Sequence, residues 1–158
     1  MSKDQDRIWE LVEKLDYCML TTAAAGKMRA RPMSSIPTPA EGVIHFMTSR
    51  EGAIDEELAA NSQVLLNYSD GSSKFVSISG VARIVEDRAL IKRLWSSGAQ
   101  AFWPNGPDDP SIIALAVSPI EADLWDGSNS IVAEVKMAFA LGSGQAPDLG
   151  DRKKVAMG

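Results

Sequence analysis

Cysteine and histidine are almost missing from this 158-residue chain, which has one of each, Cys18 and His45. A single thiol excludes an internal disulfide and a metal site built from several cysteines. The chain also lacks the serine-nucleophile elbow, the zinc-binding His-Glu-x-x-His pattern, the phosphate-binding loop and the dinucleotide-binding glycine fingerprint. The sequence therefore predicts no metal site and identifies no catalytic residue.

Positive charge and long apolar runs are also scarce. The 16 Lys and Arg residues are outnumbered by 21 Asp and Glu, which gives a net charge of −5. Such a chain has no general attraction for nucleic acid or anionic membranes, so an anionic ligand needs a local basic cluster. No apolar run approaches the ~18 residues of a membrane span, and residues 1–7 carry no apolar signal segment. We expect a cytoplasmic protein without nucleic-acid or membrane partners.

The chain does contain many short strand-like segments separated by turns. Helical periodicity over 4–15 and 51–60, and again from Asp87, predicts three helices, and a further short helix over 133–142 would make four. Apolar and alternating segments predict about six antiparallel strands, which lie within 17–24, 28–37, 43–48, 63–69, 74–85, 112–118 and 121–126. This pattern is typical of a mainly β barrel or sandwich. We expect one domain over 1–142, followed by a polar C-terminal tail over 143–158.

Arg29 and Arg31 lie two residues apart on a predicted strand, so their side chains share a face with Met33. Paired guanidinium groups match phosphate geometry. Pro32 cannot donate a ladder hydrogen bond, which places this stretch at a sheet edge or bulge. The alternative is that both arginines are ordinary surface residues paired with nearby acids.

Three further features each allow two interpretations. Thr48 and Ser49 end a strand just before a predicted helix, which suits either an anion pocket or helix capping. The Phe102-Trp103 pair can stack on a flat ligand or cover the edge of the core. The adjacent acids Glu56 and Glu57 are interpreted as solvated surface, and His45 as a structural residue.

Seven segments in order resemble the general stress protein branch of the pyridoxamine 5′-phosphate oxidase-like family. They begin with Met19-Leu20-Thr21-Thr22, Arg29-Ala30-Arg31-Pro32-Met33 and Phe46-Met47-Thr48-Ser49. Val64 to Asp70, Phe75 to Gly80, Trp103 to Pro110 and the Trp125-Asp126 pair continue the series. Together they cover most of residues 8–142.

The resemblance implies a six-stranded antiparallel Greek-key split β-barrel with short flanking helices. It also implies a homodimer with FMN at the subunit interface, and a departure from the family pattern at Ile54 makes FAD the alternative flavin. The cofactor-binding residues that it transfers to this chain are Arg29, Arg31, Pro32, Met33, Ser34, Phe46, Met47, Thr48 and Ser49, with Trp125 reaching the flavin from the partner subunit.

One position departs from the family pattern. Members often place a lysine in the first turn of the helix after Thr-Ser, and this chain has Ile54 there. A lost charge-assisted contact costs roughly 1.5–3 kcal/mol, unless Arg50 or Arg29 compensates.

Two functions of different class remain open. The first is a flavin-dependent oxidoreductase of unknown substrate, and the second is a non-catalytic flavin-binding or flavin-free stress-response dimer. A true pyridoxamine 5′-phosphate oxidase is not expected, because the C-terminus offers only Arg152, Lys153 and Lys154 as a basic cluster. A heme-binding protein of similar fold is disfavoured because His45 is the sole histidine.

Overall fold

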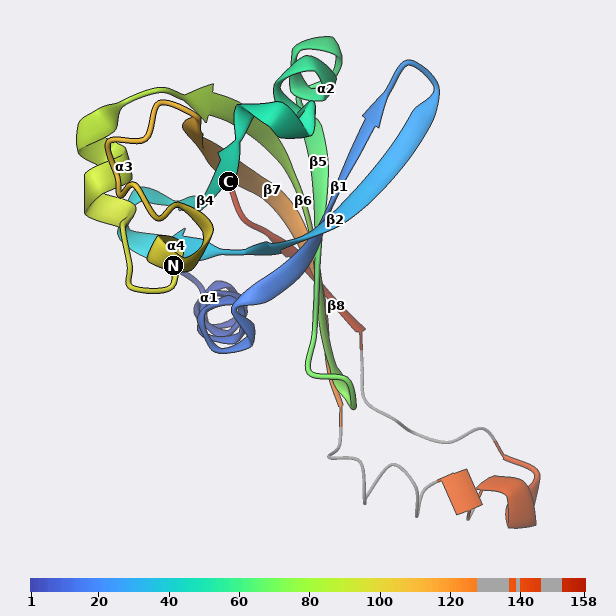
Figure 1. Ribbon diagram of the computed structural model, residues 1–158. Coiled ribbons are helices and arrows are strands. Elements are labelled where there is room, and N and C mark those ends of the chain that lie inside the picture. Colours follow the sequence, from blue (N-terminus) through green and yellow to red (C-terminus); the bar gives the residue numbers. More distant parts are fainter. Residues whose placement is uncertain (128–136, 139, 146–151) are drawn as a thin grey trace.

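The computed structural model describes residues 1–127, 137–138, 140–145 and 152–158 (Figure 1). Part of the helix expected over 133–142 lies outside the described residues. The strands are β1 (Tyr17–Ala24), β2 (Lys27–Ser34), β3 (Ile36–Thr38), β4 (Val43–Ser49), β5 (Gln63–Ser69), β6 (Lys74–Val85), β7 (Ile112–Asp126) and β8 (Arg152–Ala156). The α-helices are α1 (Lys3–Leu15), α2 (Ile54–Ala60), α3 (Arg88–Leu94) and α4 (Ala99–Phe102), and two 3₁₀ turns cover Pro39–Glu41 and Arg50–Gly52.

The strands form one antiparallel sheet that curls into a split barrel. Its order is β2-β1-β5-β6-β7-β4-β3, and β8 pairs with β7 as an additional strand. β2 and β3 are therefore the two edges of the sheet, although only Ser35 separates them in the sequence. The split between these edges leaves backbone groups of β2 free of a second neighbouring strand.

Helix α1 fills one side of the barrel with its apolar face. Its N-terminus is closed by a capping box, in which the Gln5 backbone N–H donates to Ser2 Oγ and the Ser2 N–H donates to Gln5 Oε1. Ile8 and Leu11 join the main core with the inward side chains of the strands. A second, smaller cluster under α3 contains Ile91, Leu94, Ile112 and Ala114.

The predicted fold class is confirmed, and the strand count is higher than the expected six. One difference is β7, a single strand where two were expected over 112–118 and 121–126. Pro119 lies between the two stretches of β7 that pair with β4 and β8, so its missing N–H leaves no gap in those ladders. On the β6 side the register shifts at Ser79/Gly80, opposite Pro119.

Two other differences raise the count: the segment expected as one strand over 28–37 is divided at Ser35 into β2 and β3, and residues within the predicted C-terminal tail form β8. It pairs residue for residue with the end of β7, from Glu121–Ala156 to Trp125–Arg152. Salt bridges reinforce the pairing, including Arg152–Asp123 at 2.8 Å and Lys154–Glu121 at 2.8 Å. Residues 152–156 thus belong to the sheet, while the division of the chain at residue 142 stays a prediction.

No helix in the described part of the chain is long and apolar enough to cross a membrane.

Candidate functional site

A groove of about 620 Å³ follows the split between the two sheet edges. Its size falls in the range of small-molecule sites. One wall comes from β2 and the start of β3, another from the end of β4, and a third from the segment around α4. The lining residues are Asp16, Tyr17, Arg31, Pro32, Met33, Ser34, Ser35, Ile36, Met47, Thr48, Ser49, Ser96, Gly98, Ala99, Phe102 and Trp103.

The positive charge of the groove comes from Arg31, the one basic side chain among its described lining residues. Arg31 Nη2 donates to Glu57 Oε2 at 2.6 Å, and the two side chains are 21% and 13% exposed. Thr22 Oγ1 donates to the same carboxylate oxygen at 2.5 Å, and Arg29 Nη1 to its other oxygen at 2.8 Å. Arg31 Nη1 is buried and has no hydrogen-bond partner among the described residues.

Glu57 remains ionised in this surrounding. Burial alone would raise the pKa of its carboxyl group, but the hydrogen bonds from Thr22 and Arg31 and the charges of both arginines outweigh it, so the pKa is lowered. The carboxylate thereby fixes Arg31 by one of its two amino groups.

Two hydroxyl side chains at the end of β4 line the same groove as Arg31. Thr48 and Ser49 are half-buried there, and the chain then turns into the 3₁₀ turn and α2. Ser49 Oγ accepts a long hydrogen bond of 3.5 Å from the Glu51 N–H. Both interpretations of this pair, capping and ligand binding, are compatible with its position.

Asp16, which follows α1, also lines the groove and binds the residues at the junction of β2 and β3. Its carboxylate accepts from Ser34 Oγ at 2.9 Å, and its backbone carbonyl accepts from Ser35 Oγ at 2.6 Å and from the Ser35 N–H at 2.9 Å. These bonds fix the junction of β2 and β3 against the start of β1. Hydrogen bonds within the chain therefore fix the backbone at this end of the split between β2 and β3.

The structure brings seven of the ten predicted cofactor-binding residues into the groove: Arg31, Pro32, Met33, Ser34, Met47, Thr48 and Ser49. Three lie elsewhere. Arg29 bonds to Glu57 outside the lining, Phe46 is fully buried in the main core, and Trp125 lies on the outer face of the sheet.

The two basic residues considered as replacements for the absent lysine are engaged elsewhere. Arg29 pairs with Glu57, and Arg50 pairs with Glu86 at 2.6 Å. Ile54 itself is 1% exposed and packs in the main core. The first turn of α2 contributes only acids, Asp55, Glu56 and Glu57.

Sequence reasoning missed Glu57, because paired acids are usually solvated. Its spacing gave no signal, since the arginines that bind it are 26 and 28 residues away. The sequence likewise did not indicate that Asp16, Tyr17 and the segment between α3 and α4 line the groove. Phe102 and Trp103 were noticed as an aromatic pair, and the structure places both in the groove.

His45 lies outside the groove. Its Nδ1 is 3.0 Å from Thr38 Oγ1, and its side chain is buried between β3 and the core. Desolvation is the main cause that lowers its pKa, which favours a neutral ring. This geometry agrees with a structural histidine.

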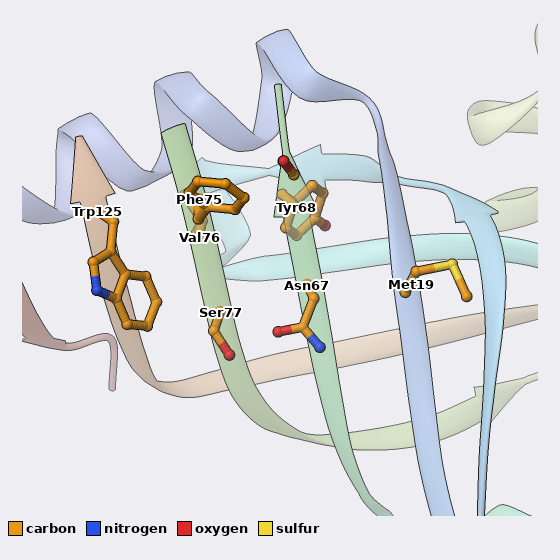
Figure 2. A pocket seen from close by; sticks show the side chains of 8 residues that line it. Met19, Asn67, Tyr68, Phe75, Val76, Ser77 and Trp125 are labelled. Carbon is orange, nitrogen blue, oxygen red and sulfur yellow. The ribbon is translucent and has the colours of Figure 1, made fainter. Parts of the chain in front are cut away.

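A second hollow lies on the outer face of the sheet (Figure 2). Met19, Asn67, Phe75, Ser77 and Trp125 project into it from β1, β5, β6 and β7, while Tyr68 and Val76 point into the core. Met19 and Phe75 are exposed apolar side chains. Tyr17, which lines the groove, lies two residues before Met19 on the same face of β1, so the groove and this outer face are continuous.

The sequence and the fold of this chain are similar to those of known proteins. The profile of the family described as "Pyridoxamine 5′-phosphate oxidase like" matches residues 3–148. General stress protein 26 of Bacillus subtilis is 28% identical over 141 residues, covering 84% of this chain and 98% of that protein. Protein bli-3 of Neurospora crassa is 24% identical over 131 residues, and the match spans 75% of this chain and 63% of bli-3.

Solved structures agree with this match. A general stress FMN/FAD binding protein from Xanthomonas citri is 30% identical, with a TM-score of 0.70 over 78% of this chain and 89% of that one. A general stress protein 26 from Jannaschia has a TM-score of 0.74 over 97% of this chain and 98% of that one, at 24% identity, and shows the shared fold. The chain belongs to the pyridoxamine 5′-phosphate oxidase-like family.

Proposed function

We propose that the groove binds the flavin FMN, with its phosphate near Arg31, Thr48 and Ser49. The observation that carries this proposal is the buried Arg31 Nη1, which has no acceptor among the described residues. A buried cationic N–H without a partner is costly, and a phosphate oxygen would satisfy it. An acidic chain that keeps a fixed guanidinium at the end of a groove is suited to an anionic ligand.

The rest of the groove suits the uncharged part of a flavin. β2 is an edge strand, so backbone groups along Arg31–Ser34 are free to bond the polar edge of a ring. Ile36, Met47 and the aromatic pair supply apolar surface. The Xanthomonas citri relative, described as FMN/FAD binding, supports the same ligand class, and FAD is the alternative cofactor.

The flavin would supply hydride and electron transfer chemistry, which the protein would tune by position and electrostatics. Residues of this chain bind and orient it: Arg31 holds the phosphate, and the Asp16 bonds to Ser34 and Ser35 keep the groove open. We propose a flavin-dependent oxidoreductase on this basis.

The second candidate is a flavin-binding protein without catalysis. One observation favours it: among the described lining residues the only carboxyl group is Asp16, which already accepts from Ser34. A general acid or base for a substrate would have to come from elsewhere.

We further propose that the active form is a homodimer with the flavin at the subunit interface. The outer face over β1, β5, β6 and β7 exposes Met19, Leu65 and Phe75, and it joins the groove through Tyr17. Exposed apolar patches of this kind are typical of interfaces. Trp125 on this face is then available to the flavin of a partner subunit.

Replacing Arg31 by Gln tests the placement of the phosphate. Titration with FMN and with riboflavin, which lacks the phosphate, is expected to show FMN affinity reduced roughly ten-fold to a hundred-fold while riboflavin affinity stays constant. Flavin fluorescence gives both affinities.

Arg29→Gln is the matched control, because it removes a second ion pair to Glu57 without touching the groove. Equal losses in the two variants, or an unchanged FMN affinity in Arg31→Gln, would show that the phosphate lies elsewhere.

A further inference from the structure

The groove differs in character along its length. Arg31, Thr48 and Ser49 make one part cationic and hydroxyl-rich, beside α2. Ile36, Phe102 and Trp103 make another part apolar and aromatic, beside α4, which Figure 1 shows well away from α2. A ligand with an anion at one end and a flat apolar ring at the other fits this arrangement.

Trp103 is anchored and Phe102 is not. Trp103 is half-buried and packs against the smaller core under α3, and its ring lies 6.4 Å from that of Trp95. Phe102 ends α4 with 75% of its surface exposed, its ring 6.1 Å from Trp103. An aromatic side chain left in water at the rim of a groove forgoes the free energy of burial that a ligand would provide.

The backbone around the pair is fixed by hydrogen bonds. The Trp103 N–H donates to the Ala99 carbonyl at 3.0 Å, and the Trp103 carbonyl accepts from the Gly106 N–H at 3.0 Å. Arg88 donates to the carbonyls of Asp109 and Ile112, both at 2.8 Å, and so holds the loop that follows. A ligand that reaches this wall meets a preorganised surface.

We infer that Phe102 is the ring-positioning residue of the site: supported by Trp103, it stacks on the planar ring system of the ligand. This inference rests on the proposed flavin function and adds a residue outside the phosphate-binding set. Stacking on an aromatic side chain depends on the ring and not on the phosphate. Phe102 therefore controls affinity for the ring, whereas Arg31 controls affinity for the anion.

The test is to titrate Phe102→Ala with riboflavin and with FMN. Loss of one stacking contact is expected to weaken both ligands by the same factor, about ten-fold. If Phe102 stacks on the ring, it quenches the fluorescence of the bound flavin. Flavin bound to Phe102→Ala should therefore fluoresce more strongly than flavin bound to the unmodified protein. Phe102→Trp should keep the affinity, and Phe102→Leu should lose most of it, because Leu keeps the apolar surface and lacks the ring.

Met28→Ala is the control, since Met28 is equally exposed but lies outside the groove. Melting temperatures of all variants show that each is folded. Unchanged riboflavin affinity in Phe102→Ala, a loss confined to FMN, or full rescue by Leu would each overturn the ring-stacking role while flavin binding by the unmodified protein stands. If the unmodified protein binds neither ligand, the proposed function fails, and the inference fails with it.

Discussion

Glu57 and Arg31 are the residues on which the geometry of the proposed site depends most. The carboxylate is reached by three donors from β1 and β2, and it is the only described acid that contacts Arg31. Without it, Arg31 would be a half-buried cation whose remaining partner among the described residues is Thr22 Oγ1, 3.4 Å from its Nη2, and an uncompensated charge of this kind is unfavourable. Glu57 thus stabilises the fold and also fixes the Arg31 side chain in the groove.

Replacing Glu57 by Gln should therefore destabilise the protein at neutral pH, by roughly 1.5–3 kcal/mol. Because folding lowers the pKa of Glu57, its stabilisation is fully present above the pKa of the unfolded state and is lost as the pH falls through the lower folded value. The difference in unfolding free energy between wild type and variant should accordingly shrink on acidification. Urea unfolding at a series of pH values measures it.

Glu56→Gln provides the control, because the neighbouring acid is exposed and contacts neither arginine. A Glu57→Gln variant as stable as wild type at neutral pH would contradict the role given to this carboxylate. A difference in unfolding free energy between wild type and Glu57→Gln that grows as the pH falls would also contradict it.

The residues of the site were predictable to different degrees. Arg31, Pro32 and the Thr48-Ser49 pair were predicted through the family resemblance, because their own patterns left two interpretations open. Glu57 was not, because an ion pair between α2 and β2 depends on how the two elements pack. Phe46 was expected among the cofactor-binding residues, and it is fully buried in the main core instead.

At the scale of elements, alternation of apolar and polar residues predicted the strands closely. β1, β5 and β6 have the expected bounds, because each alternates cleanly between core and solvent. The joining of two expected strands into β7 was not predictable, since it depends on which neighbours pair on either side of Pro119. β8 was also missed, because five mostly polar residues resemble a tail until salt bridges fix them to β7.

Gly80 shows what the junction of β6 and β7 requires. At the register shift, an added Cβ would lie 2.7 Å from the Ser118 carbonyl oxygen and 3.0 Å from Val117 Cγ1. Gly80→Ala is expected to destabilise the protein by about 1–3 kcal/mol, because the two strands would have to move apart. Thermal or urea unfolding measures the loss.

Gly52→Ala serves as the comparison, since a Cβ at Gly52 meets no atom within 4 Å. If Gly80→Ala were no less stable than Gly52→Ala, the close approach of β6 and β7 at the bulge would be wrong.

At the scale of the whole molecule, two surfaces meet along β1. The groove opens at the split of the barrel, and the apolar outer face begins beside it at Tyr17 and Met19. The groove collects residues from four separate stretches of chain, so its lining could not be derived from any one segment. The family resemblance predicted a flavin site at Arg31–Ser34 and Thr48–Ser49. The structure places these residues in one groove with the Phe102-Trp103 pair and shows that Glu57 binds Arg31.

The central claim is that the protein binds FMN as a homodimer. Sedimentation of the protein mixed with FMN tests it most directly, if the run is followed at a visible wavelength that only flavin absorbs. We expect the flavin colour to sediment with the protein, in a species of twice the 17.0 kDa chain mass. Colour that moves with a single-chain species would uphold flavin binding and overturn the dimer. Colour that remains behind as free FMN while the folded protein sediments would contradict the proposed function.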